Sequence, residues 1–330
     1  MHQPIAWRPA RVRALRTLSP TVREFELEPE GGALPWTVGS HIQVRLPIDG
    51  HIDTRSYSLV GEPGQACYRI AVKRVEASRG GSRTMWQLAA GETLEVLAPQ
   101  NQFELSTAPP QSLLVAGGIG ITPLLGMALA LASRGADFTL VHATRSRDEL
   151  VYTQALAASF GERLNCHVSA EAGRLQFDPL IAGLHPQGQM LLCGPLPMLE
   201  AARQAWARAG RPPHLLRFET FGSGGTVAAQ AFWVRLPRHG VEFVVPPERS
   251  LLDVLEQHGL ETLSDCRRGE CGLCTLDVIE LHGTLDHRDV FLSDAQKREG
   301  RRLCSCVSRV VGGGVVLDTD WRDDAAAARS

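Results

Sequence analysis

Five of the eight cysteines of this 330-residue chain lie in its last quarter, and their spacing limits what that part can fold into. Cys266, Cys271 and Cys274 are separated by four and then by two residues, and Cys304 and Cys306 follow. This is the spacing of a plant-type 2Fe-2S cluster, which four thiolates hold on a tight loop. Four thiolates also suit structural zinc, but zinc sites more often use paired Cys-x2-Cys knuckles. The pattern favours an iron–sulfur domain and leaves open whether Cys304 or Cys306 is the fourth ligand.

Length and composition restrict the function classes further. The length suggests two or three domains. A net charge of −2, from 34 basic and 36 acidic residues, gives no reason to expect nucleic acid or a membrane surface as partner. The N-terminal segment lacks the apolar run of a secretory signal, and glycines with Pro123 split the apolar stretch from Leu113 to Ser133 into a strand and a helix. These features predict a cytoplasmic protein whose clustered cysteines bind metal.

The hydrophobic pattern divides the chain into parts of different architecture. Residues 1–108 contain alternating strands, for example 41–46 and 68–73, and predict an antiparallel β-barrel domain. Residues 109–222 alternate apolar runs with helical segments and predict an α/β domain with a parallel sheet. We expect strands at 113–116, 138–141, 190–193 and 215–219, and helices after Thr122, near Asp148 and at 198–208.

A glycine- and serine-rich segment, 223–230, is the predicted linker. Residues 231–330 then predict an α+β domain that carries the cysteines, with strands at 232–236 and 241–245. A short helix should follow, with Ser250 as N-cap, Asp253 three residues later and Gly259 at its end.

Three segments of the barrel domain are suited to a flavin phosphate. Arginine offers a phosphate a planar fork of charged donors, strand backbone with a lysine adds a second positive charge, and a glycine–serine turn opens a helix with free N–H groups. Each alone has an ordinary explanation, such as barrel packing or a capped turn. Together they predict a flavin site, which does not by itself separate FMN from FAD. The residues are Arg55, Ser56, Tyr57, Ser58, Val72, Lys73, Gly80, Gly81 and Ser82.

Three strand ends of the α/β domain are suited to a nicotinamide dinucleotide. A glycine turn between strand and helix fits a pyrophosphate, although it lacks the full Gly-x-Gly-x-x-Gly spacing. Later strands also present residues at their carboxyl ends, where open α/β sheets bind ligands. Arg145, Ser146 and Arg147 would suit a 2′-phosphate as well, so NADPH stays open beside NADH. The expected contacts are Gly117, Gly118, Gly120, Thr122, Pro123, Thr144, Arg145, Cys193, Gly194, Pro195 and Met198.

Taken in this order, the motifs resemble those of the phthalate dioxygenase reductase family, within the ferredoxin reductase superfamily. Arg55-Ser56-Tyr57-Ser58 is similar to the flavin signature of the superfamily. The segments 217–222, 286–292 and 306–309 resemble the end of the family's nicotinamide domain and two parts of its ferredoxin domain.

The resemblance implies FMN, NADH and a 2Fe-2S cluster in a β-grasp ferredoxin domain. It implies that Cys306, directly before Val-Ser-Arg, is the fourth ligand and Cys304 a bystander, with a hairpin at 275–285 slightly longer than usual. It also implies the catalytic candidates: Ser58 at the reactive edge of the flavin, Cys193 beside the nicotinamide, and Phe221 over the flavin face.

The function implied is that of the reductase component of a two-component Rieske-type oxygenase. A hydride would pass from NADH to FMN, and single electrons would then pass through the cluster to a separate oxygenase. The chain is expected to be monomeric, with Arg267, Arg268 and Glu270 on the cluster loop as candidate partner contacts. A cytochrome P450 is the alternative acceptor. A redox sensor or a zinc-stapled binding module is the alternative from another class.

Overall fold

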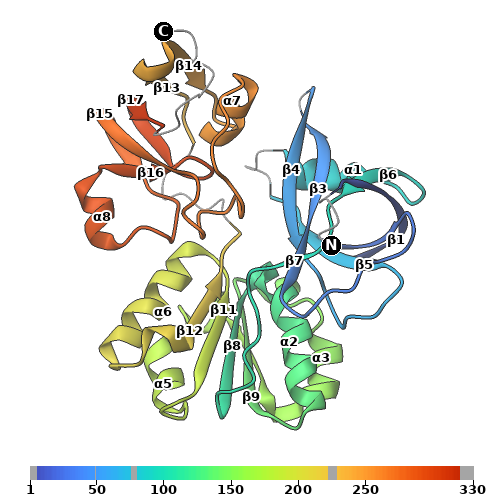
Figure 1. Ribbon diagram of the computed structural model, residues 1–330. Helices are drawn as coiled ribbons and strands as arrows, with labels where there is room; N and C mark the ends of the chain where they lie inside the picture. Colours follow the sequence, from blue (N-terminus) through green and yellow to red (C-terminus); the bar gives the residue numbers. More distant parts are fainter. Residues whose placement is uncertain (1–5, 49, 76–79, 222–228, 320–330) are drawn as a thin grey trace. The chain divides into compact units, whose positions relative to one another are not determined.

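The computed structural model describes residues 6–48, 50–75, 80–221 and 229–319. The chain divides into two compact units, Met1–Glu219 and Thr220–Ser330. The first unit contains two sheets and the second contains one (Figure 1). Of the predicted linker 223–230, all but Ala229 and Gln230 lies outside the described residues.

The first sheet is an antiparallel barrel of strands in the order β4-β3-β6-β1-β2-β5, and β7 adds to β3. A bridge between Leu59 and Ile70 joins the two end strands. The inward-facing apolar residues of the strands, such as Phe25, Ile42 and Val44, pack against each other in the barrel core, as the alternation predicts. The elements are β1 (Arg8–Ser19), β2 (Val22–Pro29), β3 (Ser40–Ile48), β4 (His51–Ser58), β5 (Tyr68–Lys73), α1 (Gly81–Gln87), β6 (Thr93–Val96) and β7 (Gln100–Asn101).

The second sheet is fully parallel, with the order β10-β9-β8-β11-β12. Figure 1 shows α2 and α3 on one face of this sheet and α5 and α6 on the other. The chain builds outward from β8 first on one side and then on the other, so β8 and β11 flank the point where the winding reverses. The elements are β8 (Gln111–Gly117), α2 (Ile121–Ser133), β9 (Asp137–Thr144), α3 (Thr153–Phe160), β10 (Leu164–Val168), α4 (Ser169–Ala172), α5 (Phe177–Ala182), β11 (Gln189–Cys193), α6 (Leu196–Arg208) and β12 (Leu216–Glu219).

The parallel sheet was predicted, but part of it was missed. Strand β10 and helices α4 and α5 are absent from the elements expected from the sequence. Strand β10 is a short edge strand in which Asn165 and Cys166 are exposed, so it lacks the apolar run that predicts a buried strand. The helix expected near Asp148 is a 3-10 turn at Arg147–Glu149 followed by α3. Helix α6 begins at Leu196, two residues before the expected Met198.

The third sheet has the order β14-β13-β17-β15-β16, in which only β13 and β17 are parallel. Helix α7 confirms the predicted capping box, since Ser250 accepts from Asp253 and Asp253 accepts from Ser250. The hairpin predicted at 275–285 is wrong: this segment is one long strand, which pairs with β16 and β17. The elements are β13 (Phe232–Leu236), β14 (Val241–Val245), α7 (Leu251–Gln257), β15 (Thr275–Asp286), α8 (Asp294–Glu299), β16 (Arg302–Cys304) and β17 (Arg309–Asp318).

The apolar stretch from Leu113 to Ser133 is divided as predicted, between β8 and α2. In the described ranges, no helix is both long and apolar enough to cross a bilayer.

Candidate functional site

The glycine turn after β8 packs directly against the end of β11. A Cβ on Gly120 would lie 2.1 Å from the carbonyl oxygen of Cys193, and one on Gly117 would lie 2.6 Å from Cδ of Pro195. Met198 is also in reach, with Sδ 2.9 Å from the Gly117 position. The absence of side chains at these two glycines therefore lets the two strand ends meet where the sheet reverses. The structure thus brings together predicted nucleotide contacts from segments some seventy residues apart.

The first turn of α2 is stabilised by a hydrogen bond from one of its own side chains. The hydroxyl of Thr122 donates to the carbonyl of Ile119 at 3.0 Å and is buried, as is the neighbouring Pro123. Gly118 adopts a φ of +58°, which glycine reaches without a steric penalty. These contacts fix the shape of the glycine turn.

His142 was not singled out from the sequence, and it supports this turn from below. Its ring is fully buried on β9, and Nε2 lies 3.1 Å from the carbonyl oxygen of Gly118. Burial lowers the pKa of His142 to about 4, so the ring is neutral at pH 7 and Nε2–H donates. Because the peptide is planar, holding the Gly118 carbonyl turns the N–H of Ile119 to the opposite side.

The loop after β9 is built around Thr144 and Arg147. The buried Thr144 hydroxyl donates to the carbonyl of Ser146 at 2.9 Å. Arg147 makes a two-armed ion pair with Glu171, with Nε–Oε1 at 2.7 Å and a second contact at 2.6 Å. Arg145 is exposed. Of the cations considered for a 2′-phosphate, Arg147 is therefore already engaged by a carboxylate.

In the barrel, Arg55 is held in place beside the start of α1. Its guanidinium forms an ion pair with the buried Asp53 at 2.6 Å and donates to the carbonyl of Thr54 at 2.9 Å. A Cβ on Gly81 would lie 2.6 Å from Nε of Arg55. The positive fork and the bare glycine backbone thus meet, as a phosphate site requires. Asp53 was missed, although its place two residues before Arg55 puts it on the same strand face.

The other flavin candidates have contacts of their own. Lys73 pairs with Glu149 at 2.5 Å, and the Ser82 hydroxyl accepts from the N–H of Val75 at 3.2 Å. Tyr57 packs against the barrel core beside Ser56, and burial raises its pKa. Val72 belongs to the barrel core, and its carbonyl accepts from the indole N–H of Trp86.

A third residue missed from the sequence, Glu219, lies at the end of β12. Its carboxylate is buried and accepts from the hydroxyl of Ser58 at 3.4 Å. Cys193, on the adjacent strand, is fully buried. Phe221, two residues after Glu219, is 36% exposed.

The cysteine loop in the second unit points backbone donors at sulfur. The N–H groups of Arg268, Glu270 and Cys271 each lie 3.4 Å from Sγ of Cys266. Gly269 and Gly272 have φ values of +76° and +77°, which curl the backbone around the thiols. Such N–H groups moderate the negative charge of a cluster held by thiolates.

The predicted ligands form two pairs of sulfurs. Cys266 interacts with Cys271, and Sγ of Cys274 lies 3.2 Å from Sγ of Cys306. The thiols of Cys304 and Cys306 beside Cys274 lower its pKa to about 3. No three metal-binding side chains surround one point in the described part of the chain. Two pairs of thiols fit a cluster with two irons, so the loop is suited to the predicted group.

The charged residues of the loop are engaged within the second unit. Arg267 pairs with Asp253 at 3.4 Å, and the buried Arg268 pairs with Glu270 at 3.4 Å. Glu270 also accepts from Thr220. Three apolar residues on and near the loop, Leu263, Leu273 and Phe291, are exposed, and so is Asp265.

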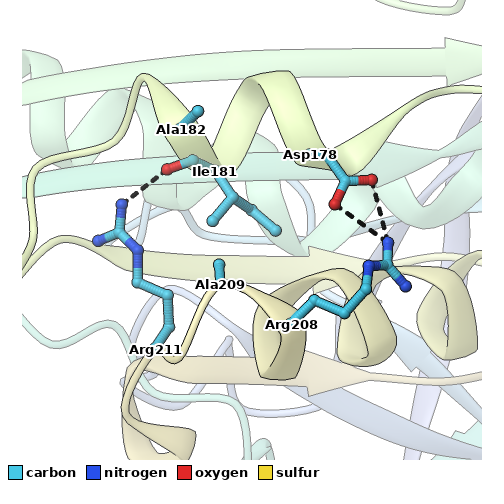
Figure 2. Close-up of a pocket in the computed structure, with 6 residues that line it drawn as sticks. All are labelled: Asp178, Ile181, Ala182, Arg208, Ala209 and Arg211. Carbon is cyan, nitrogen blue, oxygen red and sulfur yellow. Dashed lines mark hydrogen bonds and ion pairs between the residues drawn. The ribbon is translucent and has the colours of Figure 1, made fainter.

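A pocket of about 400 Å³ lies between α5 and α6, and Figure 2 shows the side chains that line it. Arg208 binds both oxygens of Asp178 there, at 3.0 and 3.1 Å, and Arg211 donates to the carbonyls of Ile181 and Leu184. Because α6 starts at the carboxyl end of β11, its last residue, Arg208, lies at the opposite edge of the sheet. The pocket therefore lies far from the glycine turn. Its two arginines are engaged by Asp178 and by backbone carbonyls at the C-terminal end of α5.

Family models match three successive parts of the chain. Residues 9–105 match an oxidoreductase FAD-binding domain, 114–204 an oxidoreductase NAD-binding domain, and 234–311 a 2Fe-2S iron-sulfur cluster binding domain. The chain is therefore an oxidoreductase with flavin, nicotinamide and iron–sulfur domains.

Similar proteins match this chain over almost its whole length. The heme-dependent oxidative N-demethylase beta subunit of Ectopseudomonas mendocina (strain ymp) is 37% identical, over 93% of this chain and 97% of that protein. The phthalate 4,5-dioxygenase oxygenase reductase subunit of Pseudomonas putida is 36% identical, over 93% and 95%. The solved structure of phthalate dioxygenase reductase is 30% identical, with a TM-score of 0.80 over 95% of this chain and 98% of that one. On this full-length similarity, the chain belongs to the phthalate dioxygenase reductase family.

Proposed function

We propose that this protein is the reductase component of a two-component Rieske-type oxygenase, with NADH as electron donor and FMN as flavin. The observation that carries the proposal is the presence of three sites in one chain, in the family's order: the Arg55–Gly81 cradle, the Gly117–Cys193 turn and the paired cysteines. When bound, the flavin accepts a hydride from the nicotinamide and the cluster passes single electrons onward. The residues bind and orient these groups.

The barrel residues would hold the flavin by its phosphate. Asp53 and the Thr54 carbonyl fix the guanidinium of Arg55, so that its remaining donors are preorganised for a phosphate. Gly80 and Gly81 allow the ligand to approach the backbone. FMN is proposed over FAD because family members with this domain order bind FMN. Heat release of the flavin and chromatography against both standards would decide between them.

The nucleotide residues would place the nicotinamide at the reversal point of the sheet. The turn from Gly117 to Gly120 receives the pyrophosphate, and the end of β11 at Cys193 borders the ring. Ser58, with its hydroxyl bonded to Glu219, would face the reactive edge of the flavin, and Phe221 would cover its face. In this arrangement no side chain has to act as general acid or base.

In the ferredoxin part, Cys266, Cys271, Cys274 and Cys306 are the proposed ligands. The contact of 3.2 Å between Cys274 and Cys306 supports Cys306 as the fourth ligand. Cys304 is buried beside the hydroxyl of Thr275 at 3.7 Å and remains a neighbour of the site. We also propose a cytoplasmic location, because five cysteines clustered in the last quarter of the chain favour a metal site in a reducing compartment. We also propose that the protein acts as a monomer.

The proposed acceptor is tested by reconstitution. Purified reductase is mixed with candidate Rieske-type oxygenases, and NADH consumption is followed together with hydroxylated or demethylated product. Product formation that depends on both proteins is the expected result, and NADH use without product for every Rieske partner would contradict it. A haem enzyme is the second candidate acceptor, because one relative is named as a subunit of a heme-dependent demethylase. The same assay with a cytochrome P450 distinguishes the two.

A further inference from the structure

The ion pair between Arg147 and Glu171 lies where an α/β sheet of this topology holds the adenosine ribose. A dinucleotide crosses the reversal point between β8 and β11, with its adenosine half on the side of β8, β9 and β10. Arg147 follows β9, and Glu171 is on α4 directly after β10. These strands are parallel neighbours, with Thr144 opposite Val168. Both residues therefore lie at the carboxyl edge of the sheet.

The pair is held in place from both sides. The N–H of Ala170 donates to the carbonyl of Arg145 at 3.1 Å, which ties α4 to the loop after β9. The ring of His167 bonds to the carbonyl of Gly173 at 2.8 Å, at the far end of α4. Glu171 thus meets both arms of the Arg147 fork at 2.7 and 2.6 Å, although both side chains are solvent-accessible.

We propose that Glu171 selects NADH over NADPH by occupying the guanidinium of Arg147. This inference rests on the proposed function and deepens it by naming a residue that sets the coenzyme. A 2′-phosphate carries between one and two negative charges and seeks a bidentate arginine. Here it would have to displace Glu171 from the arginine and remain beside a carboxylate of like charge. A 2′-hydroxyl carries no charge and meets neither conflict, so NADH leaves the ion pair between Arg147 and Glu171 in place.

Removal of the carboxylate charge should release the arginine for the phosphate. In Glu171→Gln, the Kd for NADP⁺ should fall by about tenfold or more while the Kd for NAD⁺ changes by less than about twofold, because a charged hydrogen bond is gained with only one of them. The binding measurement is calorimetric titration with each oxidised coenzyme. The kcat/KM for NADPH relative to NADH should rise by a similar factor.

Two further variants make the test specific. In the double variant Glu171→Gln, Arg147→Gln, the gain for NADP⁺ should disappear, since the released guanidinium is absent. Asp178→Asn is the matched control: it breaks a similar exposed pair with Arg208 in the pocket of Figure 2, at the other edge of the same sheet. It should change neither Kd.

The inference is overturned if Glu171→Gln leaves the ratio of the two affinities unchanged, if the gain persists without Arg147, or if neither coenzyme binds the wild-type protein. Failure of the proposed function has a separate signature, because it would appear in wild type as NADH binding without reduction of the flavin. The oxidised coenzymes need no electron acceptor, so their titrations remain informative in that case.

Discussion

The hydroxyl of Ser58, the last residue of barrel strand β4, donates a hydrogen bond to the buried carboxylate of Glu219, the last residue of β12, across 161 positions of sequence. The contact, 3.4 Å long, joins the flavin barrel to the nucleotide sheet within the first unit. It puts a polar pair beside the strand of Cys193, where the two reacting rings are proposed to meet.

Ser58→Ala should slow the reduction of the flavin by NADH by about 10- to 100-fold, because the hydroxyl proposed to face the reactive edge of the flavin is lost together with the contact to Glu219 that positions it. Flavin and iron contents should stay at wild-type levels. Stopped-flow absorbance under anaerobic conditions gives the rate. The matched control is Ser112→Ala, a buried serine that accepts from Gln189 at the other end of the sheet. Equal rates in both variants would remove Ser58 from the reaction.

Gly81→Ala should weaken flavin binding without unfolding the barrel. The new Cβ would lie 2.6 Å from Nε of Arg55 and would push this side chain off the phosphate position. Loss of one charged contact corresponds to a Kd about tenfold higher, measured by fluorescence on adding FMN to flavin-stripped protein. Gly183→Ala, where a Cβ meets nothing closer than 3.7 Å, is the control. Unchanged FMN affinity in Gly81→Ala would refute the cradle.

Replacement of the two late cysteines should have opposite effects. Cys306→Ala should lose the cluster, because a ligand paired with Cys274 is gone, whereas Cys304→Ala should retain it. The measurement is iron and acid-labile sulfide per chain, together with the visible circular dichroism of the cluster. Cluster loss in Cys304→Ala with retention in Cys306→Ala would reverse the assignment.

His142 should make stability fall as the solution is acidified. Its pKa is about 4 in the folded chain against 6.5 for a free ring, so between these values only the unfolded chain binds the proton. The free energy of unfolding is unaffected by this group above pH 6.5. It decreases as the pH falls towards 4, by about 3 kcal/mol in total. Urea midpoints from pH 7 to pH 4.5 should fall less steeply for His142→Phe than for wild type. Parallel slopes would show that the buried ring does not titrate as described.

Periodic segments could be predicted from the sequence, and single polar contacts could not. Strands β5 and β14 match their expected ranges to the residue, because each alternates or ends at a turn. Strand β10 is an exposed edge without such a signal. The hairpin expected at 275–285 followed from the resemblance and not from a hydrophobic pattern, and the structure has a single strand there, β15, with two register shifts.

The same limit applies to the site. The glycines and cysteines belong to sequence motifs, so their positions in the proposed sites could be predicted from the sequence. His142 and Glu219 contact partners that become neighbours only in the folded chain, and no sequence spacing predicts such contacts. Asp53 lies two residues before Arg55 on the same strand face, but strand alternation alone does not show that the two side chains form an ion pair. Spacing alone does not choose between Cys304 and Cys306, and the distance of 3.2 Å between the sulfurs of Cys274 and Cys306 supports Cys306 as the proposed ligand.

Anaerobic titration of the purified protein with NADH, followed by its visible spectrum, tests the central claim most directly. Electrons from NADH should bleach the yellow flavin and the red-brown cluster together, in material that contains both flavin and iron. A preparation without iron, or one in which NADH bleaches the flavin while the oxidised cluster persists, would contradict an electron path from nicotinamide through flavin to the four cysteines.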